Sequence, residues 1–246
     1  AGMPVMEGKA VLFDYLVGVS GVPILIQSRD PKVIIDTVRN IAPTFGAIKL
    51  EDIKAPECFE IEDTLDAELD IPVMHDDQHG TAVVVLAALL NTTRFSGLML
   101  SKAVVGMIGL GAAGMGISKL LLAYGVKEVI GADLDPSACD RLVAAGGKEE
   151  SLDDVLKKAH VIIATTGCPG LIKPEMVRKG SVILALSNPN PEITPDLAIQ
   201  AGASFAADGK SVNNALAFPG LFRGALNVRA TTINNKMKIA AAKVIA

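Results

Sequence analysis

Tryptophan is absent from this chain of 246 residues, and all aromatic residues together make up only 4% of it. The core must therefore be aliphatic, built from Ala, Val, Ile and Leu. Such a composition suits parallel α/β layers, whose strands are buried on both faces. Half of the residues are hydrophobic and a fifth are charged, so we expect a compact globular protein.

Cysteine is scarce too, and Cys58, Cys139 and Cys168 are far apart in the sequence. An odd number of scattered cysteines argues against a disulfide framework and favours a reducing compartment, which we expect to be the cytoplasm. No uncharged apolar run of about eighteen residues is present, so we expect no membrane span. The net charge of −4 gives no electrostatic reason to expect nucleic acid as a partner.

Apolar strand-like runs alternate with helix-like segments, which predicts an α/β fold. In residues 1–95 the pattern predicts helices over 31–41, 56–69 and 82–91, and strands over 22–26, 47–50 and 71–74. A second unit begins near residue 96 and has predicted strands over 103–108, 127–132, 160–164 and 181–187. After residue 213 the pattern changes again, to a helical C-terminus.

A glycine-rich turn in the second unit matches G-x-G-x-x-G between a predicted strand and a predicted helix. Its glycines permit a tight turn and close approach to a pyrophosphate, which the helix N-terminus also attracts. The following strand ends at Asp133, which could hold the adenosine ribose and favour NAD over NADP. The alternatives are a packing turn and a loop acid. The predicted cofactor-binding residues of the turn are Gly109, Gly111, Ala112, Ala113 and Gly114.

Two acidic pairs, Glu51-Asp52 and Asp76-Asp77, each follow an apolar strand-like run. Carboxylate oxygens are the ligands that Mg²⁺ and Mn²⁺ prefer. Neighbouring residues of a strand point to opposite faces, so we expect Asp76 and Asp77 to differ in role. One would bind a metal and the other would orient a base. Solvated surface acids are the alternative for either pair alone.

Lys9 is a candidate base, because a neighbouring cation favours the neutral form of a lysine, which can accept a hydroxyl proton. The alternative is an ordinary surface lysine. His75 and His79 are four residues apart, but no third soft ligand follows, so we expect structural or hydrogen-bonding roles. Cys168 is interpreted as a loop residue, and His160 has no partner that the sequence identifies.

These segments together resemble the malic enzymes, and the similarity covers essentially the whole chain. The matching segments, in order, are residues 4–10, 41–46, 50–53, 75–82, the glycine turn, and residues 187–189, 212–214 and 218–220. Any one of them occurs by chance in many proteins, whereas the ordered set is specific. The chain is more similar to the short bacterial-type branch than to the longer animal type.

The resemblance implies a role for each of several polar residues. The implied ligands of Mg²⁺ or Mn²⁺ are Glu51, Asp52 and Asp77. Lys9 is the implied general base and Asp76 the acid paired with it. The implied residues at the nicotinamide and the substrate carboxylate are Asn188 and Asn214, with Asn213 beside them on the cofactor.

The resemblance also implies two domains and an activity. Residues 1–95, with 214–246 returning to them, form a metal- and substrate-binding α/β domain, and residues 96–213 form a Rossmann-type NAD(P)-binding domain. The implied reaction is metal-dependent oxidative decarboxylation of malate to pyruvate and CO₂ with NAD or NADP, in a homodimer. Another NAD(P)-dependent dehydrogenase, of the amino-acid or shikimate type, and a catalytically silent NAD(P)-binding module stay open as alternatives.

The chain opens at Ala1-Gly2 with Met3 third, and we expect a segment to be missing ahead of it. Malic enzymes use an upstream tyrosine to protonate enolpyruvate, and Tyr15 and Tyr124 lie in no matching motif. We therefore expect residues 1–246 alone to bind the dinucleotide but to turn over weakly or not at all. The stretches after Asp133 and before Val212 look short for the family, so the cofactor preference stays open.

Overall fold

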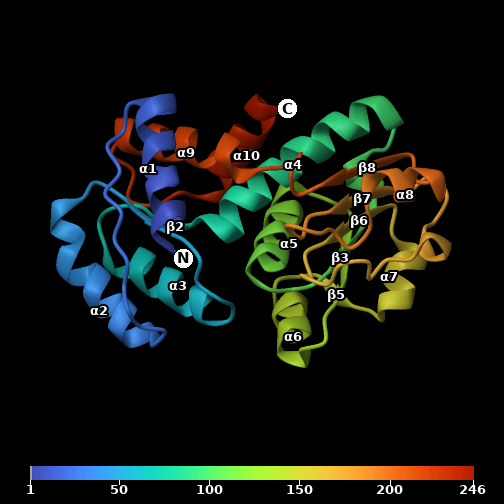
Figure 1. Cartoon of the computed structure of the whole chain (residues 1–246), viewed down its shortest axis with the longest axis horizontal. Helices are drawn as coiled ribbons and strands as arrows, with labels where there is room; N and C mark the ends of the chain where they lie inside the picture. Colours follow the sequence, from blue (N-terminus) through green and yellow to red (C-terminus); the bar gives the residue numbers. More distant parts are fainter. Residues whose placement is uncertain (1) are drawn as a thin grey trace.

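Two α/β parts lie side by side in the structure, a computed structural model that describes residues 2–246 apart from the side chains of residues 95 and 96. The long helix α4 (Asp76–Ser96) runs between the two parts (Figure 1). The first part has a two-stranded parallel sheet and five helices: β1 (Ile48–Leu50), β2 (Val73–His75), α1 (Gly2–Val17), α2 (Pro31–Ile41), α3 (Glu57–Glu68), α9 (Phe218–Asn227) and α10 (Asn235–Ile245). The domain boundaries predicted from the sequence stay a prediction.

The second part is a six-stranded parallel sheet in the order β5-β4-β3-β6-β7-β8. The order reverses between β3 and β6, as in doubly wound dinucleotide-binding folds, which bind ligands at the carboxyl ends of these strands. The strands are β3 (Val104–Ile108), β4 (Glu128–Ala132), β5 (Lys148–Glu149), β6 (Val161–Ala164), β7 (Val182–Ala185) and β8 (Phe205–Asp208). The helices are α5 (Ala112–Tyr124), α6 (Pro136–Ala144), α7 (Leu152–Lys158) and α8 (Pro195–Gln200). Four short 3₁₀ helices complete the chain: η1 (Ala42–Thr44), η2 (Leu100–Lys102), η3 (Pro174–Met176) and η4 (Asn214–Leu216).

The larger sheet separates two aliphatic cores, because successive strand residues point to opposite faces. Val105, Met107 and Ile163 pack on the side of α4 and α5, whereas Ile108 and Ile162 pack on the side of α7 and α8. A third, smaller core lies between α2, α3 and the two-stranded sheet. Both faces of the large sheet are therefore covered, as the aliphatic composition predicts. None of the described helices is long and apolar enough to cross a membrane.

The predicted elements agree with the structure where the local signals are strong. Helix α2 covers the predicted residues 31–41, and its N-cap Asp30 accepts a hydrogen bond from the backbone N–H of Lys32. The strand predicted over residues 22–26 is wrong, because these described residues form no strand and lie irregularly between α1 and α2. The small sheet pairs only β1 with β2, so this run has no ladder to join. The short strands β5 and β8 had no sequence signal strong enough to predict them.

Helix α4 packs closely against α5, and Gly116 of α5 makes the contact possible. A methyl group on Gly116 would overlap the carbonyl oxygen of Gln78 and would lie 2.8 Å from the Cα of Gln78. Both obstacles belong to the backbone, which cannot rotate away as a side chain can. The first turn of α4 is thereby held against the helix that follows the glycine-rich turn.

We predict that Gly116→Ala destabilises the protein by about 1–3 kcal/mol, the usual cost of overfilling a packed interior. Chemical unfolding measures this free energy. The matched control is Gly224→Ala in α9, where an added methyl group meets nothing within 4 Å. Alanine favours helix more than glycine does, so the control should be neutral or slightly stabilising. Equal stability of the Gly116→Ala variant and the native protein would contradict the packing account.

Candidate active site

The carboxyl ends of β1 and β2 bring the two acidic pairs together. Leu50 pairs with His75 in the parallel register, so the residues that follow both strands lie at the same edge. Asp76 and Asp77 are the first residues of α4, where the helix dipole favours negative charge. The strand-based expectation for this pair is therefore wrong in detail, and so is the predicted helix start at residue 82. The two side chains still diverge, because neighbouring helical residues point in different directions.

Three carboxylates converge in the first part of the molecule. Glu51, Asp52 and Asp77 each offer an oxygen, and these oxygens lie within 4.8 Å of one another. The Oδ2 atom of Asp77 also accepts a hydrogen bond from the backbone N–H of Asp52 at 2.9 Å. Burial opposes ionisation, but the neighbouring His75 ring and this N–H keep the pKa of Asp77 below its ordinary value. An all-oxygen donor set of this kind fits a hard divalent cation such as Mg²⁺ or Mn²⁺.

Lys9 meets the buried carboxylate of Asp76 beside this cluster. The Nζ atom of Lys9 lies 2.7 Å from Asp76 Oδ2 and 3.2 Å from Glu51 Oε1. It also donates a hydrogen bond to Asn214 Oδ1 at 3.1 Å. The structure thus joins residues from α1, α4 and η4 that are far apart in sequence.

Lys49 and Phe218 belong to this site, although sequence reasoning did not select them. The ammonium of Lys49 contacts the Glu51 carboxylate and lies 3.1 Å from Asp76 Oδ2. Desolvation by burial lowers the pKa of Lys49 to about 8. Both ammonium groups lie over the ring of Phe218, with Lys9 Nζ 4.6 Å and Lys49 Nζ 4.8 Å from its centroid. Lys49 stands two residues before Glu51 in a strand, so the two-residue period could have placed both on one face.

Gly80 allows α4 to approach the site closely. A methyl group at Gly80 would overlap the Asp76 carboxylate and would lie 3.2 Å from the Cβ of Asn214. The residue is therefore a packing requirement of the Lys9–Asp76–Asn214 arrangement.

The glycine-rich turn lies at the carboxyl end of β3, next to β6. Gly109 has a positive φ of 88°, and a methyl group there would lie 2.9 Å from the carbonyl oxygen of Thr165. Gly111 is the N-cap of α5, and a methyl group there would meet nothing within 4 Å, which leaves open space in front of the helix. Ala112, Ala113 and Gly114 form the first turn of α5. The free backbone N–H groups at this helix N-terminus therefore suit a pyrophosphate.

Asp133, which directly follows β4, stabilises this turn by hydrogen bonds. Its Oδ2 atom accepts a hydrogen bond from the N–H of Leu110 at 2.6 Å, and its Oδ1 atom accepts one from the N–H of Asp135 at 2.9 Å. Each oxygen keeps a second lone pair, so the carboxylate can still accept a ligand hydroxyl.

The three asparagines predicted from the resemblance differ in their surroundings. Asn214 contacts Lys9, as described above, whereas Asn188 follows β7 and packs against Gly209. The Oδ1 atom of Asn213 caps η4 by accepting a hydrogen bond from the N–H of Ala215 at 2.9 Å. Asn213 also lines a separate cavity between α4 and β8.

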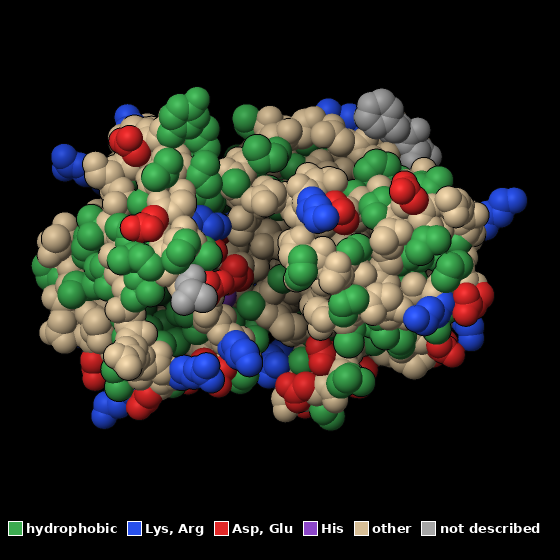
Figure 2. Space-filling model, viewed as in Figure 1, with side chains coloured by type: hydrophobic (Ala, Val, Ile, Leu, Met, Phe, Trp, Pro, Cys, Tyr) green, Lys and Arg blue, Asp and Glu red, His purple; other side chains and the backbone are tan. Residues whose placement is uncertain are grey.

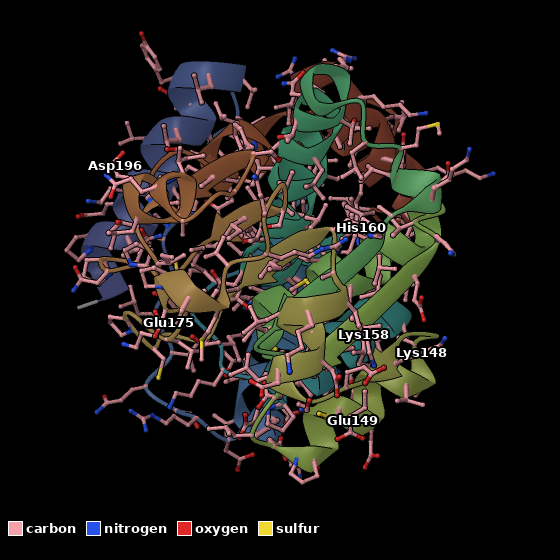
Figure 3. The ribbon with its side chains drawn as sticks, turned by 90° about the vertical axis from the view of Figure 1, so that its right-hand side faces the viewer. Lys148, Glu149, Lys158, His160, Glu175 and Asp196 are labelled. Atoms are coloured by element: carbon pink, nitrogen blue, oxygen red, sulfur yellow. The ribbon has the colours of Figure 1, made fainter. Side chains whose placement is uncertain are left out.

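The histidines take part in hydrogen bonding, as expected. His75 is fully buried behind Asp77, and His79 contacts Glu62 and Lys238. His160, which is labelled in Figure 3, directly precedes β6. Its Nδ1 atom accepts a hydrogen bond from the N–H of Val104 at 3.1 Å. Cys168 lies exposed in the loop after β6.

A cavity of about 680 Å³ opens onto the acidic cluster. Lys9, Glu51 and Asp52 contribute its polar wall, and Phe222 and Leu226 contribute part of its apolar wall. The molecular surface is hollowed between the two parts, and acidic and basic side chains gather at the wall of this hollow (Figure 2). The cavity therefore gives a small polar substrate access to the carboxylates.

Comparisons with known proteins agree with this geometry. The family "S-adenosyl-L-homocysteine hydrolase, NAD binding domain" matches residues 79–198, which hold the glycine-rich turn. NAD-dependent malic enzyme 1 of Bacillus subtilis is 60% identical over all of this chain, which spans 56% of that relative. This chain therefore covers a little over half the length of that protein.

Two solved structures extend the comparison. The malic enzyme of Pyrococcus horikoshii is 43% identical with a TM-score of 0.89, over 98% of this chain and 63% of that one. The NAD-dependent malic enzyme of Thermotoga maritima is 39% identical with a TM-score of 0.90, over 98% of this chain and 70% of that one. Similarity of this extent in both sequence and fold shows that the chain belongs to the malic enzyme family.

Proposed function

We propose that the protein containing this chain oxidatively decarboxylates malate to pyruvate and CO₂, with a divalent metal and a nicotinamide dinucleotide. The observation that carries the proposal is the convergence of Glu51, Asp52 and Asp77 beside the Lys9–Asp76 pair. A carboxylate cluster that suits a hard cation lies beside a lysine that can accept a proton, and the same chain carries a glycine-rich turn that suits a dinucleotide.

Each nearby side chain has a definite part in this proposal. The carboxylates of Glu51, Asp52 and Asp77 would hold Mg²⁺ or Mn²⁺, which when bound supplies Lewis acidity towards substrate oxygens. The dinucleotide, held at the glycine-rich turn, Asp133, Asn188 and Asn213, supplies the hydride acceptor. Lys9, as the general base, accepts the proton of the malate hydroxyl.

The remaining groups hold Lys9 in position. The buried carboxylate of Asp76 fixes the Lys9 amine at 2.7 Å, and Asn214 accepts its hydrogen bond from the other side. Phe218 packs against the same amine and limits its contact with water. Asn214 and Asn188 present amide donors that could bind a substrate carboxylate.

NAD is the cofactor that we propose, and two features support it over NADP. Residues 133–137 after β4 include two acids and no Lys or Arg, which disfavours the 2′-phosphate of NADP. The name of the relative from Bacillus subtilis also specifies NAD. The choice between Mg²⁺ and Mn²⁺ stays open, because both accept the same oxygen ligands.

We also propose a cytoplasmic homodimer that acts on malate and pyruvate and does not bind nucleic acid. Helix α1 exposes the apolar side chains of Val11, Tyr15 and Leu16, with Tyr15 82% exposed. An apolar surface of this kind favours burial against a partner.

The proposed function predicts that the protein forms pyruvate and CO₂ from malate and NAD⁺ only when Mn²⁺ or Mg²⁺ is present. Chelation with EDTA should remove this activity, and added metal should restore it. NADP⁺ should support a lower rate than NAD⁺. Metal-independent oxidation of malate without CO₂ would instead favour a different dehydrogenase, and NAD⁺ binding without turnover in the full-length protein would favour a silent binding module.

Lys9→Ala should lower kcat for malate oxidation by about a hundredfold or more, because it removes the general base. The affinity for NAD⁺ should stay unchanged, since Lys9 is not one of the residues proposed to bind the dinucleotide. Steady-state kinetics and calorimetric titration with NAD⁺ measure the two effects. Lys32→Ala, an exposed lysine of α2, is the control. Normal turnover in Lys9→Ala would remove Lys9 from the catalytic role.

Asp77→Asn should raise the Mn²⁺ concentration needed for half-maximal rate by about tenfold or more, because metal affinity depends on ligand charge. The amide keeps the shape of the side chain, so the fold should persist. Asp63→Asn in α3 is the matched control, because Asp63 is exposed and lies outside the carboxylate cluster. An unchanged metal dependence would reject Asp77 as a ligand.

A further inference from the structure

A buried chain of polar side chains lies behind the carboxylate cluster. It begins at Lys238 in α10, whose side chain enters the protein interior and is only 7% exposed as a residue. The Nζ atom of Lys238 donates a hydrogen bond to His79 Nδ1 at 2.9 Å. His79 Nε2 then donates to Glu62 Oε2 at 3.0 Å. Three helices, α10, α4 and α3, are thus joined by a lysine, a histidine and a carboxylate.

Glu62 links this chain of side chains to the first turn of α4 by hydrogen bonds. Its Oε1 atom accepts the backbone N–H of His75 at 2.7 Å, and its Oε2 atom accepts Gln78 Nε2 at 2.7 Å. The same amide of Gln78 donates to His75 Nδ1 at 3.2 Å. Since Nδ1 of His75 accepts, the ring proton lies on Nε2.

The His75 ring completes the connection to the cluster. Its Nε2 atom lies 3.2 Å from Asp77 Oδ2, the oxygen that also accepts the backbone N–H of Asp52, in a contact that lacks hydrogen-bond geometry. The ring is fully buried, so it has no freedom to leave this place without disturbing its neighbours. The chain therefore runs from the C-terminal helix to two of the three carboxylates that converge on one another.

Lys238 fixes the tautomer of His79. Its ammonium can only donate, so His79 must accept at Nδ1 and donate at Nε2. Glu62 can only accept, so Gln78 presents its amide N–H₂ to Glu62 and to His75 Nδ1, which leaves the ring proton of His75 on Nε2, 3.2 Å from Asp77 Oδ2. Without the ammonium, His79 Nδ1 would be left as a buried acceptor without a partner, and the ring would gain by reversing its tautomer.

We propose that Lys238 is a positioning residue for the divalent-metal site, acting through His79, Glu62 and His75 on the orientation of Asp77. This inference rests on the metal-binding part of the proposed function. Partners behind metal ligands commonly fix the direction of the ligand atoms and thereby set the affinity for the metal. A lysine with a purely structural role, which only held α10 against α3, would stabilise the fold but would not act selectively on metal binding.

The test is Mn²⁺ binding to the purified protein, measured by electron paramagnetic resonance without substrate or cofactor. Lys238→Met should raise the Kd for Mn²⁺ by about tenfold or more. The Kd for NAD⁺, measured by calorimetry on the same samples, should stay unchanged. Lys236→Met is the matched control, because Lys236 is exposed on the same helix and should leave both constants unchanged.

A second readout needs no metal at all. Nitrogen-15 NMR of the histidine rings should show protonated Nε2 in both His75 and His79 of the native protein, and a changed tautomer of His79 in Lys238→Met. If Lys238→Met does not fold, Glu62→Gln takes its place. The glutamine keeps the shape of the glutamate, but it presents an N–H₂ group to neighbours that can only donate, and so it interrupts the same chain of hydrogen bonds.

Two outcomes would overturn the proposal. One is a lower melting temperature with an unchanged Kd for Mn²⁺, and the other is a parallel loss of Mn²⁺ and NAD⁺ binding. Either result would make Lys238 a structural residue. Native protein that binds Mn²⁺ normally but does not decarboxylate malate would contradict the proposed function and leave this inference intact.

Discussion

The repulsion between carboxylates at the ends of β1 and β2 is the constraint on which the site depends. The parallel register of two three-residue strands brings Glu51 and Asp76 to one edge, where their like charges repel each other. Lys9 and Lys49 offset this repulsion by sharing the Asp76 carboxylate and each contacting Glu51. The fold can keep acids together here only because it supplies ammonium groups from α1 and β1.

Helix α4 connects these carboxylates to the glycine-rich turn. Its first turn carries Asp76 and Asp77, and the backbone of the same turn packs on Gly116 of α5, the helix that begins at the glycine-rich turn. A shift of α4 would therefore move the carboxylates and the dinucleotide-binding turn relative to each other. Two close approaches, at Gly80 and Gly116, leave little room for such a shift. The geometry between the substrate side and the cofactor side is thus set by the Gln78 backbone against Gly116 and by the Asp76 and Asn214 side chains against Gly80.

Sequence reasoning was most successful where the signal is local. Residues 31–41 carry a capping acid, a proline at the first helical position and an apolar stripe, and the predicted helix is confirmed. The glycine-rich turn likewise predicts the strand before it and the helix after it from a few neighbouring residues. Lys49, Phe218, Glu62 and Lys238 escaped prediction because their importance depends on partners that the chain brings together only by folding. The strand predicted over 22–26 failed for a related reason, since an apolar run becomes a strand only beside another strand. The roles assigned to Asn188 and Asn213 stay predictions.

Charge balance links the two polar layers of the site. Five carboxylates (Glu51, Asp52, Glu62, Asp76 and Asp77) meet three ammonium groups, Lys9, Lys49 and Lys238, across the cluster and the chain behind it. Burial lowers the pKa of His79, which keeps this ring neutral between Lys238 and Glu62. Glu51 and Asp76 are each contacted by a lysine, whereas Glu62, Asp52 and Asp77 have no lysine within ion-pair distance among the described side chains. Asp52 and Asp77 are therefore the two acids of the cluster whose charge a divalent cation would balance, and they lie where three carboxylates already converge. Because Lys238 contacts His79 rather than an acid of the cluster, the residues behind the cluster can position Asp77 without competing with a metal for it.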